Sequence, residues 1–103
     1  MNSYTPDRWE VVKLSSEEHN VSSKKILCSW YGGYLTGDSW KLSSEISSIA
    51  SFDDRGEFTT ESGSRYVYYF GARGISGIMS VIIRSIEDEG VDVEILEGYD
   101  DKS

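Results

Sequence analysis

The apolar pattern predicts a β-rich chain up to about residue 70. A first strand is expected at 9–14 (WEVVKL) and an apolar strand at 25–31 (KILCSWY), joined by a polar, Ser-rich loop over 15–25. Further short strands are expected between turns that contain Gly or Asp, at 34–36, 40–42, 46–52, 57–60 and 65–70. The last of these, RYVYYF, is rich in the aromatic and β-branched residues that favour strands.

The period of the apolar positions then changes. Isoleucine or methionine recurs at helical spacing, at Ile75, Ile78, Met79, Ile82, Ile83 and Ile86. This stripe predicts a helix over about 75–89, with Gly74 or Ser76 at its start and Gly90 after its last turn. Over 91–97, apolar residues alternate with acids, which predicts a final half-buried strand.

These elements predict an α+β fold. An antiparallel twisted sheet of about five to seven short strands needs its apolar face covered, and the helix stripe can cover it. We expect a single globular domain over 1–97 and an acidic polar tail over 98–103.

Composition excludes several classes of protein. The chain has 103 residues with one Cys and one His, so neither a disulfide framework nor a multi-His or four-Cys metal site can form. No apolar run approaches the roughly 18 residues of a membrane span, and the polar start is not that of a signal peptide. We therefore expect a cytoplasmic protein with a reduced Cys28, no cofactor and no metal.

Charge is concentrated at the end of the chain. Residues 1–84 carry ten acidic and nine basic residues, whereas residues 85–103 carry eight acidic residues and one basic residue. The candidate partner-binding residues are these eight acids: Glu87, Asp88, Glu89, Asp92, Glu94, Glu97, Asp100 and Asp101. We expect folding to gather them into one outward-facing surface that repels nucleic acid and attracts a basic protein surface. The alternative is that the acids serve only solubility.

A glycine-rich stretch separates the strand at 65–70 from the helix. Its candidate anion-binding residues are Gly71, Arg73, Gly74 and Gly77, because backbone amides at a helix start favour anions. The spacing G-x-x-G-x-x-G matches neither a P-loop nor a dinucleotide fingerprint, which favours a tight connection instead. The aromatic residues of the strands form either core, a protein-binding patch or a cage for a cationic ligand.

Two segments resemble short uncharacterised proteins of phages and prophages. The segments are 34–44 (YLTGDSWKLSS) and 62–66 (SGSRY), which contain a G-x-x-W-[RK]-L-[NS]-S segment followed by S-G-S-x-Y. The resemblance implies a phage or mobile-element origin, and small acidic phage proteins are often inhibitors of host defence, including anti-CRISPR proteins. It brings no catalytic residues.

The interpretation is a non-enzymatic inhibitor in the cytoplasm of a bacterial host. Its acidic surface is expected to bind a basic, nucleic-acid-binding surface of a host protein or ribonucleoprotein complex, without contacting nucleic acid or membrane directly. The alternative is a small structural or adaptor domain, monomeric or homodimeric through a sheet edge. An enzyme is not expected, because no nucleophile, base and orienting group can be assembled from these residues.

Overall fold

The protein folds into two four-stranded sheets and one α-helix. The computed structural model describes residues 2–18, 20–32 and 38–96. The elements in chain order are β1 (Ser3–Tyr4), β2 (Arg8–Ser16), β3 (Val21–Trp30), β4 (Ser39–Leu42), β5 (Ile46–Ser51), β6 (Arg55–Thr60), β7 (Arg65–Tyr69), the 3-10 helix η1 (Phe70–Ala72), α1 (Gly77–Asp88) and β8 (Asp92–Ile95). The α+β class is confirmed.

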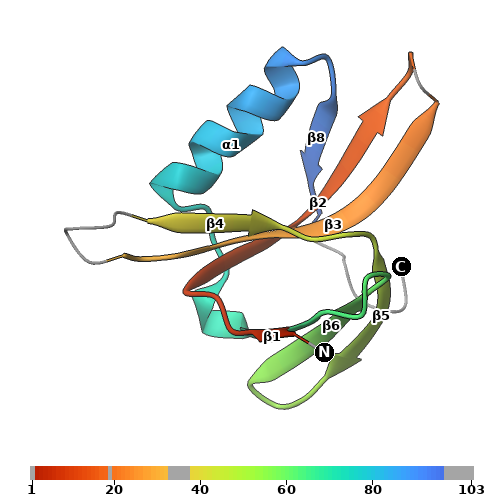
Figure 1. Ribbon diagram of the computed structural model, residues 1–103. Coiled ribbons are helices and arrows are strands. Elements are labelled where there is room, and N and C mark those ends of the chain that lie inside the picture. The colour runs from red at the N-terminus through yellow and green to blue at the C-terminus, as the bar shows by residue number, and fades with distance from the viewer. Residues whose placement is uncertain (1, 19, 33–37, 97–103) are drawn as a thin grey trace.

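The strands divide between two sheets rather than one. Sheet 1 has the order β1-β7-β6-β5 and sheet 2 has the order β4-β3-β2-β8. All neighbours are antiparallel except β1 and β7, which are parallel. Figure 1 shows sheet 1 below sheet 2, with α1 on the far side of sheet 2 from sheet 1. Sheet 2 is therefore the middle layer.

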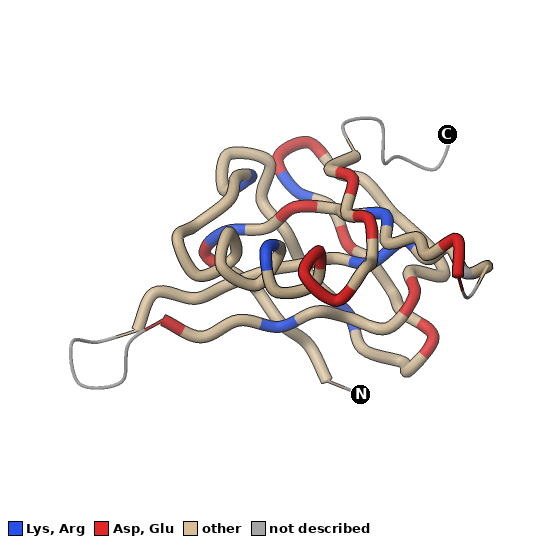
Figure 2. Tube along the Cα trace, turned by 90° about the horizontal axis from the view of Figure 1, so that it is seen from above, with Lys and Arg blue, Asp and Glu red and all other residues tan. Residues whose placement is uncertain are grey.

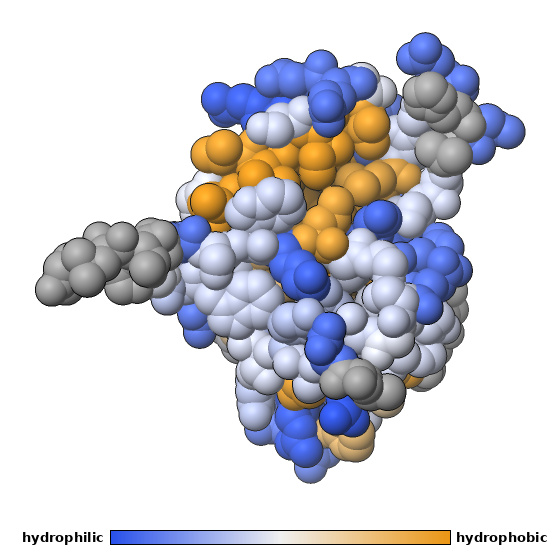
Figure 3. All heavy atoms as spheres, viewed as in Figure 1, coloured by the Kyte–Doolittle hydropathy of each residue, from blue (hydrophilic) through white to orange (hydrophobic). Residues whose placement is uncertain are grey.

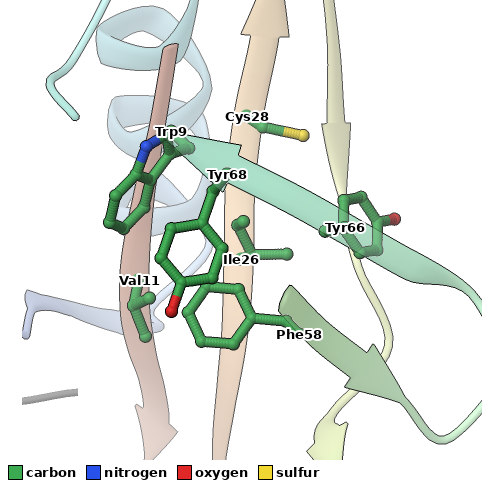
Figure 4. Packing of buried hydrophobic residues seen from close by; sticks show 7 residues of the cluster. All are labelled: Trp9, Val11, Ile26, Cys28, Phe58, Tyr66 and Tyr68. Carbon is green, nitrogen blue, oxygen red and sulfur yellow. The ribbon is translucent and has the colours of Figure 1, made fainter. Parts of the chain in front are cut away.

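Aromatic residues fill the space between the two sheets. Trp9, Ile26 and Cys28 of sheet 2 face Phe58 and Tyr68 of sheet 1, and all five are fully buried. The Phe58 and Tyr68 rings are stacked with centroids 4.2 Å apart, and the Trp9 and Tyr68 centroids are 4.5 Å apart (Figure 4). This aromatic contact fixes how the sheets are placed on each other.

The helix covers the other face of sheet 2. Met79 of α1 packs against Val12 of β2 and Leu27 of β3, and all three are buried. Because sheet 2 is covered on both faces, consecutive apolar residues occur in the middle of β2, at 11–12, and of β3, at 26–28, in place of a strict alternation. The predicted stripe is confirmed as the packing face at Ile82 and Ile83, which also contact this cluster.

A side-chain contact with sheet 2 holds the start of α1 in place. Ser76 is the N-cap residue of α1, and its Oγ lies 2.7 Å from Oγ of the buried Ser29 on β3. Ile75 lies outside the helix, so the helix begins two residues later than predicted. Gly90 has φ +90°, which confirms the left-handed position expected after the last turn.

The predicted loop over 15–25 is wrong. β2 continues to Ser16 and β3 begins at Val21, so a long hairpin with a short turn replaces the loop. The backbone pairing continues through polar partners such as Ser15 and Ser22. A polar stretch of this kind has no apolar periodicity from which a strand could be predicted. The expected strand 34–36 and the tail 98–103 lie outside the described residues.

Neither described helix combines the length and apolarity that a membrane crossing requires.

Candidate functional site

The last turn of α1 carries three exposed acids. Glu87, Asp88 and Glu89 end the helix where backbone carbonyls already make the potential negative, and the last turn contains no basic residue. Arg84 lies one turn earlier and is also exposed. Among the described residues, no basic group lies within 4.0 Å of any of these three carboxylates.

Two further acids lie on β8. Asp92 and Glu94 are exposed and alternate with the half-buried Val93 and Ile95. Val93 and Ile95 pack with the cluster beneath α1, so Asp92 and Glu94 project from the opposite face of sheet 2. On that face Glu94 pairs across the ladder with Lys13, and no ion pair within 4.0 Å joins the two described side chains.

The five described acids therefore do not share one face. Those of the helix end lie on the α1 side of sheet 2, and those of β8 project from the side that faces sheet 1. Figure 2 shows acidic positions spread around the trace rather than confined to one side. The predicted single surface is replaced by two acidic groups on either side of β8, because strand alternation sends Asp92 and Glu94 away from the helix. Glu97, Asp100 and Asp101 lie outside the described residues.

An apolar groove lies between α1 and β8, on the α1 side of β8. It has a volume of about 340 Å³ and is lined by Ser80, Ile83, Arg84 and Glu87 of α1 and by Val93 and Ile95 of β8. Figure 3 shows the apolar surface of this region in orange, between α1 and β8. Sequence reasoning missed the groove because it assigned the whole isoleucine stripe to the core. Ile75, which also lines the groove, is 47% exposed.

Arg73, at the centre of the predicted anion-binding loop, contacts other parts of the protein. Arg73 Nε lies 2.7 Å from Glu10 Oε1, and Arg73 Nη2 donates to the Leu96 carbonyl at 2.6 Å. Its guanidinium also lies over the Trp9 ring, 5.5 Å from the centroid. Arg73 thus joins the loop, β2 and the end of β8. Anion binding by Gly71, Gly74 and Gly77 stays a prediction.

Cys28 has the environment of a packing residue. It is fully buried in the core between the sheets, and burial raises the pKa of its thiol from the ordinary 9.0 to about 12, with a smaller lowering by Lys41. The thiol is therefore protonated at neutral pH, whereas a nucleophile requires the thiolate. Within the described parts of the chain, no group of three or more His, Cys, Asp or Glu residues is placed to hold a metal ion.

The aromatic residues separate into core and surface. Tyr66 and Tyr68 are buried, whereas Tyr31, Trp40, Tyr69 and Phe70 are exposed and come from different elements. Core packing is thus confirmed for Tyr66 and Tyr68.

Comparison of the chain with protein-family models, with curated proteins and with solved structures gave no match.

Proposed function

We propose that this protein is a non-enzymatic inhibitor that binds a basic, nucleic-acid-binding surface of a host complex through the acids around β8. The observation that carries the proposal is that five exposed carboxylates, on Glu87, Asp88, Glu89, Asp92 and Glu94, have no described basic group within 4.0 Å. Of the other described acids, three are paired with arginine, whereas exposed ones such as Asp53 and Glu61 are not. Glu10, Asp54 and Glu57 each lie within 4.0 Å of an arginine nitrogen.

The placement of these acids favours binding to lysine and arginine. Asp92 and Glu94 are separated by about 6.6 Å along a strand, on a rigid element of a sheet. Such spaced charges draw a basic partner toward the site and speed association, and they compete with the phosphates that the same partner surface binds. Salt screens charges over about 8 Å at physiological ionic strength, so the binding is expected to weaken as salt rises.

The kind of partner rests on the resemblance of 34–44 and 62–66 to phage and prophage proteins. On that basis the partner is a bacterial defence complex, of the kind that anti-CRISPR proteins inhibit, and the place of action is the cytoplasm of the host. This assignment comes from association with a class of proteins.

A charge-reversal pair tests the proposal. The test variant carries Asp92→Lys and Glu94→Lys, and the matched control carries Asp53→Lys and Glu61→Lys, which change the net charge equally at exposed positions near sheet 1. Wild type and both variants, each checked for thermal unfolding, are immobilised and exposed to an extract of the native bacterial host. Captured proteins are quantified by mass spectrometry at low and high salt.

We expect a nucleic-acid-binding complex on the wild type and on the control, lost from the test variant and reduced by salt. Free wild-type protein should then displace nucleic acid from that complex in a mobility-shift assay. Equal capture by all three baits, or capture of no such complex, contradicts the proposal. A salt-independent homodimer in size-exclusion chromatography with light scattering supports the adaptor interpretation instead.

A further inference from the structure

β8 is an edge strand whose outer backbone groups face away from β2. The Leu96 N–H donates to the Val11 carbonyl with an N···O distance of 2.9 Å. Because bonded pairs alternate along an antiparallel ladder, Asp92 and Glu94 also turn their backbone groups toward β2. The N–H and C=O groups of Val93 and Ile95 therefore point to the outer edge, where no other strand of the described chain pairs with β8.

The same two residues line the apolar groove. Val93 and Ile95 direct their side chains toward α1, where Ile83 forms the opposite wall. A strand paired with the outer edge of β8 would alternate in the same way, with every second side chain on the α1 side, beside the groove. The edge thus offers both main-chain hydrogen bonds and an apolar pocket, the two components of strand addition.

The other face of β8 determines the charge of the incoming strand. Residues that pair with Asp92 and Glu94 place their side chains beside these carboxylates, and opposite charges in that position stabilise a sheet whereas like charges destabilise it. A second copy of this chain, paired antiparallel through β8, brings acid next to acid, and a parallel pairing places the acids of each copy beside Val93 and Ile95 of the other. The acids therefore disfavour self-association through this edge, as charged residues on edge strands generally do.

We propose that the outer edge of β8 receives an extended segment of a basic partner protein, in which apolar side chains facing the groove alternate with lysine or arginine facing Asp92 and Glu94. This inference rests on the proposed function, because it specifies how the basic partner binds. The segment is short, since β8 has four residues.

The probes are synthetic peptides about eight residues long, a common strand length. The first alternates Val or Ile with Lys or Arg. The second has the same sequence, but every second backbone nitrogen, on the edge that would pair with β8, is methylated. The third has Glu in place of each basic residue. Binding to the full chain is followed by fluorescence anisotropy, and amide hydrogen exchange is measured by NMR.

We expect the first peptide to bind and the other two to bind at least about tenfold more weakly, since main-chain bonds or charge attraction are removed. Exchange at Val93 and Ile95 should slow when the first peptide binds, whereas exchange at Glu94, already bonded to β2, should not change. Ser80→Phe, which fills the groove without altering charge, should weaken binding, and Ser85→Phe on an exposed position outside the groove should not.

The outcomes separate this inference from the proposed function. Equal binding of the methylated peptide, or no effect of Ser80→Phe, overturns strand addition, while loss of binding in the Asp92→Lys, Glu94→Lys variant still supports charge-driven docking. Equal binding of the acidic peptide overturns the basic partner and contradicts both. Absence of binding by every peptide at millimolar concentration overturns strand addition alone, because the host complex is tested separately by capture.

Discussion

Gly56→Ala is expected to destabilise the protein strongly, because the centre of the core leaves no room for a methyl group there. Gly56 is buried on β6 and pairs directly with Tyr68 on β7. A Cβ at this position would lie 2.8 Å from Tyr68 Cε1 and still closer to Cζ and Oη. Contacts of this kind require the ring or the backbone to move.

The ring has little freedom to move. Tyr68 is fully buried. Its ring centroid lies 4.2 Å from that of Phe58, with the two rings stacked, and 4.5 Å from that of Trp9. Overpacking of a filled core typically costs 1–3 kcal/mol and occasionally more. Since the ring is held by two neighbours, we expect a loss of about 3 kcal/mol, which corresponds to a lowering of Tm by roughly 12–24 °C for a domain of this size.

Urea unfolding followed by tryptophan fluorescence measures this loss. Gly77→Ala is the matched control, because nothing lies within 4 Å of its added Cβ and alanine is favoured over glycine in a helix. In a Tyr68→Leu background, which lacks the ring atoms that the Cβ meets, Gly56→Ala should cost much less than in the wild type. A free energy of unfolding within about 0.5 kcal/mol of the wild type, a difference typical of surface substitutions, would refute the steric argument.

Two further predictions concern the ion pair and the buried thiol. Arg73→Ala should lower the free energy of unfolding by about 2 kcal/mol or more, because it leaves the Glu10 carboxylate buried without its arginine. The expected loss is below the 3–5 kcal/mol found when a fully buried pair is broken, because the Arg73 side chain is 28% exposed. Adding Glu10→Gln should recover part of the loss in calorimetry, and no recovery would contradict the ion-pair explanation. Because burial raises the pKa of Cys28 to about 12, folding favours the protonated thiol, so its contribution to stability is complete below pH 9 and is lost as pH rises toward 12. The loss, up to roughly 4 kcal/mol, should be absent from Cys28→Ala in urea titrations at each pH, and rapid reaction of the native thiol with a disulfide reagent at pH 8 would disprove it.

Apolar periodicity was sufficient for the class of fold and for most elements. The change from period two to helical spacing after residue 74 located α1, and the runs at 9–14 and 25–31 located the two central strands. Their lack of alternation is the mark of a strand covered on both faces, and here it reflects a sheet between a second sheet and a helix. The assignment of each strand to one of the two sheets, and the strand order within each sheet, depend on contacts between distant residues. No local pattern in the sequence contains this information.

Sequence reasoning failed where backbone pairing has no apolar signature. Polar residues such as Ser15 and Lys24 continue the β2–β3 hairpin, and the two-residue strand β1 is too short to show any period. The candidate site was located by charge, but its geometry was not. Charge counting cannot distinguish Glu87, on the helix side, from Glu94, on the opposite face, because that difference arises from the pleat of β8.

The acids at the helix end bear on how such a partner would be held. Each exposed anion in the last helical turn is unfavourable by roughly 0.3–1 kcal/mol, and the three at Glu87, Asp88 and Glu89 also repel one another. No described cation within 4.0 Å relieves this in the free protein. A partner's lysine or arginine would remove the unfavourable energy on binding, so the same arrangement that lowers the stability of the free chain would raise its affinity. Surface charge placed only for solubility has no reason to be concentrated where the helix dipole opposes it, and this is the physical ground for preferring a binding role.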